Sequence, residues 1–292
     1  MPSLPTDIRV DRDGRSLSVR LAGAAAGPLV LYVHGSPSSR VDVEYLHESS
    51  TRRGVRVAAI DRPGYGHSTF MPFTFRSVAA DAAAVADHLA AETFAVYGFS
   101  TGVAHGAALA AEFPERVTAL ATAGGGAPFE AGTPRWSRLS EGERRGLALV
   151  GTDDAEASRL LAEPDRQFVG MLELDDEAIA AAWAAASHPA DARAFTGELG
   201  RIIGPSMREA LRQGQLGWAR DNVVWMARWD FDLKAIRCPT TIWLGDEDGA
   251  GTLEGGRWLA DQIPHAELRV IPDRGHLIGF ELWDEVLDSL NV

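Results

Sequence analysis

The feature that most constrains the fold is an alternation of short apolar runs with helical patterns between residues 28 and 125. The apolar runs are rich in β-forming residues, and the segments between them carry small apolar residues at helical spacing. This alternation predicts a parallel sheet with helices on both faces. The predicted strands lie within 28–35, 54–66, 93–100 and 115–125, and the predicted helices cover 78–92 and 102–113.

The rest of the chain departs from this alternation in two places. Residues 7–23 alternate around a turn at Asp13-Gly14, which predicts an antiparallel hairpin. Residues 128–231 show helical periodicity and no clear strand, after which short strands return in 240–248 and 266–276, and a last helix covers 282–290. We therefore expect a discontinuous α/β core, residues 1–127 and 232–292, that carries an inserted helical cap, residues 128–231.

Composition excludes several classes of protein. A net charge of −13 argues against a nucleic-acid-binding surface, and a single cysteine, Cys238, excludes an internal disulfide. The N-terminal residues lack the pattern of a secretory signal, and no apolar run approaches the roughly 20 residues of a membrane span. Phosphate-loop, HExxH and paired CxxC motifs are absent, so we expect no cofactor and no metal. We expect a cytoplasmic protein that acts on a small molecule and binds neither nucleic acid nor a membrane.

The segment Gly98-Phe99-Ser100-Thr101-Gly102 is the strongest candidate for chemistry. It follows a predicted strand and precedes a predicted helix, where a sharp turn projects the serine oxygen and small neighbours let strand and helix approach. The start of the helix adds amide donors and a favourable dipole. We interpret Ser100 as a nucleophile rather than a residue of a structural turn.

A nucleophilic serine needs a base and an acid that orients it. His276, in the loop after the last predicted strand, is the candidate base because histidine titrates near neutral pH. The loop Gly245–Gly249 after the preceding strand offers Asp246, Glu247 and Asp248. We favour Asp248, which lies furthest into the loop, and the other two remain alternatives.

The loop HGSPSSR, residues 34–40, also follows a predicted strand. The backbone amide of Ser36 in this loop and the amide of Thr101 are the expected donors of an oxyanion hole, a pair of groups that stabilises the negative oxygen of a tetrahedral intermediate.

Taken together, these motifs resemble the α/β-hydrolase superfamily. Ser, Asp and His occur in that order, GFSTG resembles the nucleophile elbow, and HGSP resembles the oxyanion loop. DRPGYGHS, FPERVTALATAGG, LGDED and RGH are similar to further family segments. The resemblance covers nearly the whole chain and implies the α/β-hydrolase fold: a mostly parallel eight-stranded sheet, flanked by helices, with the helical block as a lid. Departures occur in residues 101–105, which lack an extra glycine, and in GAGTLEGG after Asp248.

The predicted function is a serine hydrolase that cleaves an ester, thioester, lactone or amide of a small, partly hydrophobic molecule through an acyl-enzyme. The serine argues against dehalogenases and epoxide hydrolases of the superfamily, which use aspartate at the elbow. A non-hydrolytic use of the same residues, as in a lyase, C–C bond cleavage or a cyclase, remains an alternative, and a receptor-like binding protein is a further one. Trp218, Trp225 and Trp229 lie on one predicted helical face, which most often indicates packing between cap and core. The alternative is that this face, together with Phe99, forms the wall of a substrate pocket.

Overall fold

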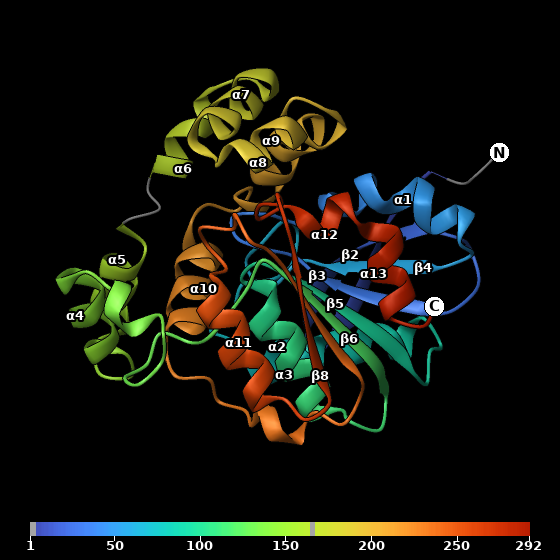
Figure 1. Ribbon diagram of the computed structural model, residues 1–292, viewed down its shortest axis with the longest axis horizontal. Coiled ribbons are helices and arrows are strands. Elements are labelled where there is room, and N and C mark those ends of the chain that lie inside the picture. Colours follow the sequence, from blue (N-terminus) through green and yellow to red (C-terminus); the bar gives the residue numbers. More distant parts are fainter. Residues whose placement is uncertain (1–3, 164–166) are drawn as a thin grey trace.

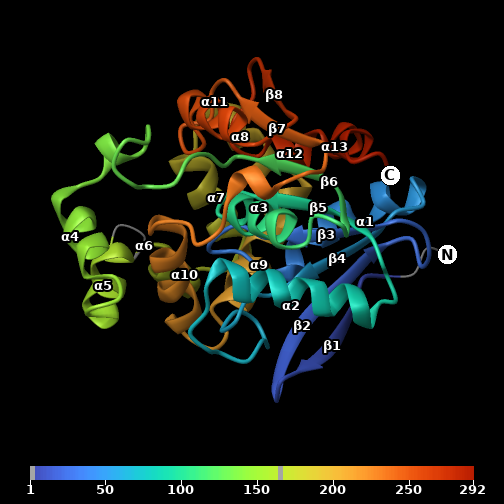
Figure 2. The ribbon, with the colours of Figure 1, turned by 90° about the horizontal axis from the view of Figure 1, so that it is seen from below.

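The computed structural model describes residues 4–163 and 167–292 and has an eight-stranded sheet with helices on both faces (Figure 1). The strand order is β1-β2-β4-β3-β5-β6-β7-β8, which Figure 2 shows from β8 at the top to β1 at the bottom. β2 runs antiparallel to both neighbours, and all pairs from β4 to β8 are parallel, as predicted. The strands are β1 Thr6–Arg12, β2 Arg15–Gly23, β3 Leu29–Val33, β4 Arg56–Ile60, β5 Phe94–Phe99, β6 Val117–Ala123, β7 Thr240–Gly245 and β8 Ala266–Ile271.

The central strands are buried on both faces because each face is covered by helices. Leu31 of β3 and Val96 of β5 join the core cluster beneath α2 and α3, whereas their neighbours Tyr32 and Tyr97 join the cluster beneath α1 and α13. This two-residue alternation explains why the central strands are apolar runs in the sequence. The core helices are α1 Val43–Arg52, α2 Phe75–His88, α3 Gly102–Glu112, α11 Leu253–Gln262, α12 Ile278–Glu281 and α13 Trp283–Ser289.

One core helix starts earlier than the sequence pattern predicts. Apolar spacing predicts a helix over 78–92, but α2 covers Phe75–His88. Thr74 and Ser77 form a reciprocal capping box that fixes the start of the helix, a local signal that apolar spacing alone does not carry. Ala90, just after its end, has a φ of 54°, which is incompatible with continuing the helix.

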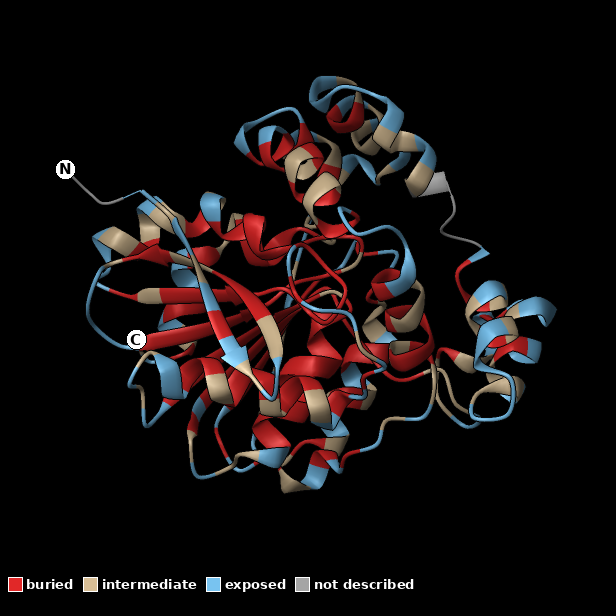
Figure 3. Cartoon of the chain, turned by 180° about the vertical axis from the view of Figure 1, so that it is seen from behind, coloured by how far each residue is buried: buried red, intermediate tan, exposed pale blue. Residues whose placement is uncertain are grey.

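Between β6 and β7, the described residues form helices and loops without a strand. In Figure 1 the helices α6 to α9 lie above the sheet, and α4 and α5 stand to one side. These helices expose much more surface than the strands do (Figure 3). The division into a core and a cap of residues 128–231 stays a prediction. The helices of the block are α4 Glu141–Leu149, α5 Asp154–Leu161, α6 Gln167–Gly170, α7 Asp176–Ala186, α8 Pro189–Phe195, α9 Glu198–Ala210 and α10 Leu216–Met226.

The helices α9 and α10 are joined to the sheet domain by buried polar contacts. Ser206 of α9 donates a hydrogen bond to Asp42. Asp221 of α10 forms an ion pair with Arg62, in which Oδ2 of Asp221 lies 2.6 Å from Nη2 of Arg62. Both acidic side chains are buried. Within the described residues, no helix has the length and apolar content that crossing a bilayer would require.

Candidate active site

Ser100 occupies the turn between β5 and α3. Its φ is 54°, in the left-handed region that non-glycine residues rarely adopt, and its amide donates a 2.8 Å hydrogen bond to the carbonyl of Ala123 in β6. The turn is therefore strained locally and held by the neighbouring strand. This is the backbone geometry expected of a nucleophile elbow.

The two glycines that flank the turn are required by close backbone contacts. A Cβ atom on Gly98 would lie 2.5 Å from the carbonyl oxygen of Gly102, and one on Gly102 would lie 2.1 Å from that of Val33. Both distances are far below van der Waals contact, so α3 can leave the sheet at this angle only with glycine at both positions.

The structure brings Ser100, His276 and Asp248 together from three loops. The Nε2 atom of His276 lies 3.1 Å from Oγ of Ser100, and its Nδ1 atom lies 3.2 Å from both carboxylate oxygens of Asp248. An ionised carboxylate accepts hydrogen bonds, so Nδ1–H donates to Asp248 and Nε2 accepts from the serine hydroxyl. Such a chain can carry a proton from the serine to the imidazole.

Of the three acidic residues in the loop after β7, only Asp248 reaches the histidine. Asp246 and Glu247 are exposed, and Glu247 forms an ion pair with His188. Asp248 is 7 % exposed, and its Oδ1 atom accepts 2.8 Å hydrogen bonds from the amides of Ala250 and Gly251. The unusual continuation of this loop thus forms a turn that fixes the carboxylate.

Neighbouring charges move the pKa values of the pair apart. Burial alone would raise the pKa of Asp248, but His276 and the two loop amides lower it to about 2. Burial alone would lower the pKa of His276, but the charge and hydrogen bond of Asp248, with a further contribution from Asp191, raise it above its ordinary value. Asp248 therefore stays ionised at neutral pH and stabilises an imidazolium at His276.

Asp191 of α8 is a site residue that sequence reasoning missed. Its carboxylate accepts hydrogen bonds from the backbone amides of His276, at 2.9 Å, and Leu277, at 2.8 Å. A Cβ on Gly275 would lie 2.2 Å from one of its oxygens, so the glycine of the RGH motif leaves space for this carboxylate. The helical block thereby fixes the loop of the histidine. No local sequence signal marks Asp191, because its partners lie more than 80 positions away.

A mainly apolar cavity of about 120 Å³ opens beside Ser100. Ser36 and Phe99 line it from the core, as does His276, and α7 to α9 supply the opposite wall. Both Ser36 and Phe99 thus line this cavity, and their binding of a substrate stays a prediction. The helical block contributes Trp183, Phe195, Leu199, Ile202 and Ile203.

Thr101 lies on the other side of Ser100, where it lines a second cavity of about 290 Å³. It is the cap residue of α3, so its amide stands outside the hydrogen-bond ladder of the helix. The oxyanion-hole roles of the Ser36 and Thr101 amides stay predictions.

Comparison with known proteins places this arrangement in a family. A family model described as alpha/beta hydrolase fold matches residues 28–281. The chain belongs to this family. The sheet order, the elbow at Ser100 and the insertion after β6 now have a common explanation, and the resemblance that the sequence suggests is confirmed.

Individual relatives of this α/β-hydrolase are distant. An uncharacterised hydrolase of Saccharomyces cerevisiae is 34% identical over 134 residues, a match that covers 44% of this chain and only 46% of the yeast protein. The bifunctional esterase/perhydrolase of Acinetobacter calcoaceticus is 24% identical over 273 residues, 91% of each chain. A thermophilic esterase from Thermogutta terrifontis, solved with malate bound, has a TM-score of 0.64 at 22% identity and covers 99% of this chain and 97% of its own. These relatives support a hydrolase of the α/β type.

The tryptophan stripe requires a correction. α10 ends at Met226, so Trp229 lies beyond the helix and does not continue the face of Trp218 and Trp225. Trp225 lines the second cavity beside Ser100, but Trp218 lies about 10 Å further along α10, in a separate buried cluster with Tyr65 and Leu211. Trp218 is therefore a packing residue and lines neither cavity at Ser100.

A second Asp–His pair lies within this α/β-hydrolase. Asp221 accepts a 3.0 Å hydrogen bond from Nε2–H of His105, one helical turn beyond the elbow, and it also pairs with Arg62. Tyr65 donates a further 2.8 Å hydrogen bond to the same carboxylate. All four side chains are fully buried. Burial lowers the pKa of His105, so this imidazole stays neutral inside the fold.

Proposed function

We propose that this α/β-hydrolase is a serine hydrolase that cleaves a carboxylic ester, thioester, lactone or amide of a small, partly hydrophobic molecule through an acyl-enzyme. The observation that carries the proposal is the continuous chain of contacts from Ser100 through His276 to Asp248, beside an apolar cavity. Nucleophile, base and orienting acid are the three groups that acyl transfer requires.

In the acylation step, Oγ of Ser100 attacks the substrate carbonyl while its proton passes to Nε2 of His276. Asp248 holds Nδ1–H and stabilises the imidazolium that results. The amides of Ser36 and Thr101 donate to the oxyanion. The tetrahedral intermediate then collapses, the bond to the leaving group breaks, and the imidazolium returns its proton to that group.

Deacylation uses the same residues in reverse. Water takes the place of the leaving group and attacks the acyl carbonyl, while Nε2 of His276 accepts its proton. When the second tetrahedral intermediate collapses, the proton passes to Oγ of Ser100 and the carboxylic acid leaves. The enzyme thus returns to its starting state and needs no cofactor.

The apolar cavity supports a small, uncharged substrate portion beside the nucleophile. Aromatic and branched aliphatic side chains form most of its walls, and its volume matches a few carbon atoms rather than a long acyl chain. The Acinetobacter relative, described as an esterase and perhydrolase, adds support for acyl transfer at such a site.

The test combines covalent labelling with turnover. The protein is treated with a fluorophosphonate, the adduct is mapped by mass spectrometry, and hydrolysis of p-nitrophenyl esters of two to eight carbons is measured. We expect a single adduct on Ser100, fastest turnover of the short esters, and loss of both labelling and turnover in Ser100→Ala.

Two outcomes would contradict the proposal. An adduct that persists in Ser100→Ala would show that Ser100 is not the nucleophile. Absence of turnover with esters, thioesters, lactones and amides, in a protein that still labels at Ser100, would favour non-hydrolytic use of the same three residues.

A further inference from the structure

The second cavity beside Ser100 differs in chemistry from the apolar one. It is lined by Ser100 and Thr101 on one side and by the first turns of the helical block on the other. Two of its lining residues are arginines, Arg135 and Arg138. A cationic cavity in contact with the proposed nucleophile is unexpected in a chain whose net charge is −13. Whether its arginines pair with carboxylates of the protein decides whether the cavity can bind an anion.

Arg135 is buried without a carboxylate partner. It is 6 % exposed, and among residues 4–163 and 167–292 no ion pair reaches it. Its Nη2 atom donates a 2.7 Å hydrogen bond to the carbonyl of Ala250, but its Nε–H finds no acceptor in the described residues. Burial lowers its pKa to about 10, so the side chain is still charged at neutral pH. Burial of a charge without an opposite charge is costly.

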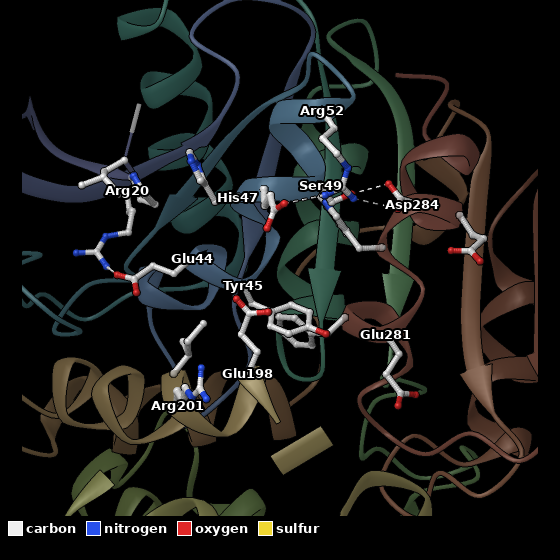
Figure 4. A pocket seen from close by; sticks show the side chains of 17 residues that line it. Arg20, Glu44, Tyr45, His47, Ser49, Arg52, Glu198, Arg201, Glu281 and Asp284 are labelled. Atoms are coloured by element: carbon white, nitrogen blue, oxygen red, sulfur yellow. Dashed lines mark hydrogen bonds and ion pairs between the residues drawn. The ribbon is translucent and has the colours of Figure 1, made fainter. Parts of the chain in front are cut away.

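Other buried arginines of the protein do not share this feature. Arg40 lies 2.6 Å from Asp61, and Arg62 lies 2.6 Å from Asp221. In a larger surface cleft of about 830 Å³, shown in Figure 4, Arg20 pairs with Glu44 and Arg52 with Asp284. Arg135 therefore stands out as a buried arginine that contacts no carboxylate in the described residues, although the charge of Asp248 acts on it.

Two aromatic rings border the guanidinium of Arg135, whose N–H donors all lie in its own plane. Its central carbon lies 4.9 Å from the ring centre of Phe129 and 5.5 Å from that of Trp225. Aromatic rings that cover the faces of a guanidinium leave its edge to make hydrogen bonds. An in-plane edge with charged N–H donors matches a planar carboxylate.

The loop after Asp248 connects this arginine to the catalytic acid. The carbonyls of Gly249 and Ala250 accept hydrogen bonds from Arg138 and Arg135, while the amides of Ala250 and Gly251 donate to Asp248. One loop thus positions both the acid and the cationic wall. This gives a physical role to the GAG continuation by which the loop departs from the family pattern.

We propose that Arg135 binds a carboxylate of the substrate, which makes the second cavity an anion subsite beside the nucleophile. The inference rests on the proposed function, and it narrows the substrate to an ester, thioester, lactone or amide that carries a free carboxylate. The uncharged portion lies in the apolar cavity on the other side of Ser100. The carboxylate belongs either to the acyl group, as in a half-ester of a dicarboxylic acid, or to the leaving alcohol.

Two matched substrate pairs test the proposal. Mono-4-nitrophenyl glutarate and 4-nitrophenyl pentanoate differ by a carboxylate in place of the terminal methyl of the acyl group. 4-(Acetoxymethyl)benzoate and 4-methylbenzyl acetate differ in the same way in the leaving alcohol. We expect the enzyme to prefer the anionic member of at least one pair, with a kcat/KM about 10- to 100-fold higher.

The variant Arg135→Met removes the charge and keeps the apolar stem between the two rings. We expect it to abolish the preference, so that the anionic and neutral members of a pair are hydrolysed with similar kcat/KM, and we expect Arg135→Lys to retain part of the preference. Arg144→Met is the matched control, because Arg144 also stacks on an aromatic ring, that of Trp136, but is exposed and does not line the cavity. It should leave the preference unchanged.

A binding measurement separates this inference from the proposed function. Calorimetric titration of Ser100→Ala with glutarate should show binding that the added Arg135→Met change removes. If no ester is hydrolysed but this Arg135-dependent binding is found, the anion subsite stands and the hydrolase proposal fails. If neither pair shows a preference, or if Arg135→Met slows both members of a pair equally, the anion subsite is overturned.

Discussion

Two Asp–His pairs in this molecule have the same chemical groups and opposite environments. His276 and Asp248 meet in loops at the carboxyl ends of strands, and a quarter of the His276 side chain is exposed. His105 and Asp221 meet in the interior, where neither side chain is exposed. The pKa of His276 is raised and that of His105 is lowered. Residue type therefore does not decide what an Asp–His pair can do.

The difference arises from the third partner of each pair. Beyond His276 lies the hydroxyl of Ser100, at the border of two cavities. In the buried pair, the carboxylate of Asp221 also forms an ion pair with Arg62. The ring centre of Phe75 lies 4.7 Å from that of His105. The first histidine can accept a proton from the Ser100 hydroxyl. The second is a neutral imidazole whose hydrogen bond to the ionised Asp221 joins α10 to the core.

The largest expected effect separates the two histidines. His276→Gln should lower kcat by about 10⁴- to 10⁶-fold, because Ser100 loses the acceptor of its proton. His105→Gln should leave kcat within about threefold but lower the free energy of unfolding by about 1–3 kcal/mol, because a buried hydrogen bond is disturbed. Ester turnover measures kcat, and urea unfolding measures the free energy of unfolding, for both variants. A large loss of kcat in folded His105→Gln would break it.

Substitution of the two aspartates should likewise lower activity at Asp248 and stability at Asp221. Asp248→Asn should lower kcat by about 10⁴-fold, because it favours the wrong tautomer of His276. Asp221→Asn should lower the free energy of unfolding by about 3–5 kcal/mol, because it leaves the buried charge of Arg62 without its counter-ion. Thermal and urea unfolding with active-site titration of the folded fraction measure both. Equal stability of Asp221→Asn and the unchanged protein would contradict this interpretation of α10.

The smallest effects are in pH dependence, and they arise from two histidine pKa shifts of opposite sign. The base must be neutral, so kcat/KM for a neutral ester should rise with pH through a midpoint above 6.5, the ordinary pKa of histidine. A midpoint below 6.5 would show that Asp248 does not raise the pKa of His276.

Stability should respond to the other histidine. Below pH 6.5 the unfolded chain binds a proton at residue 105 that the folded protein does not, because the folded pKa is lowered. The free energy of unfolding should therefore fall as the pH drops below 6.5. Unfolding in urea between pH 7.5 and 5 should show a shallower decline for His105→Gln, and an unchanged slope would argue against a neutral His105.

Much of the fold could be predicted from the sequence because its signals are local. The hairpin over 7–23, the strands with their terminal glycines and the interruption after residue 127 all follow from periodicity and turn residues within a few positions. The same holds for the elbow, whose glycines and serine are adjacent. The prediction that Trp229 shares a helical face with Trp218 and Trp225 was wrong, because spacing alone did not reveal that α10 ends before Trp229.

The remaining parts of the site depend on partners far apart in the chain. Arg62 and Asp221 are separated by 159 positions, and Asp191 and His276 by 85. The hydrogen-bond partner of Arg135, the Ala250 carbonyl, lies 115 positions away. No pattern within a window of sequence carries such pairs, so sequence reasoning identified neither Asp191 nor Arg135.

By itself, the sequence determined the order of the strands along the chain, the turn that presents Ser100, and the loops that hold a histidine and three acidic candidates. Only the tertiary structure decided that Asp248 is the carboxylate that contacts His276, that His276 lines a cavity while His105 is fully buried, and that Arg135 forms no ion pair with a described residue. The physical reason is that backbone conformation responds mainly to neighbouring residues. Protonation and reactivity depend on burial and on opposite charges, which only the folded chain brings into contact.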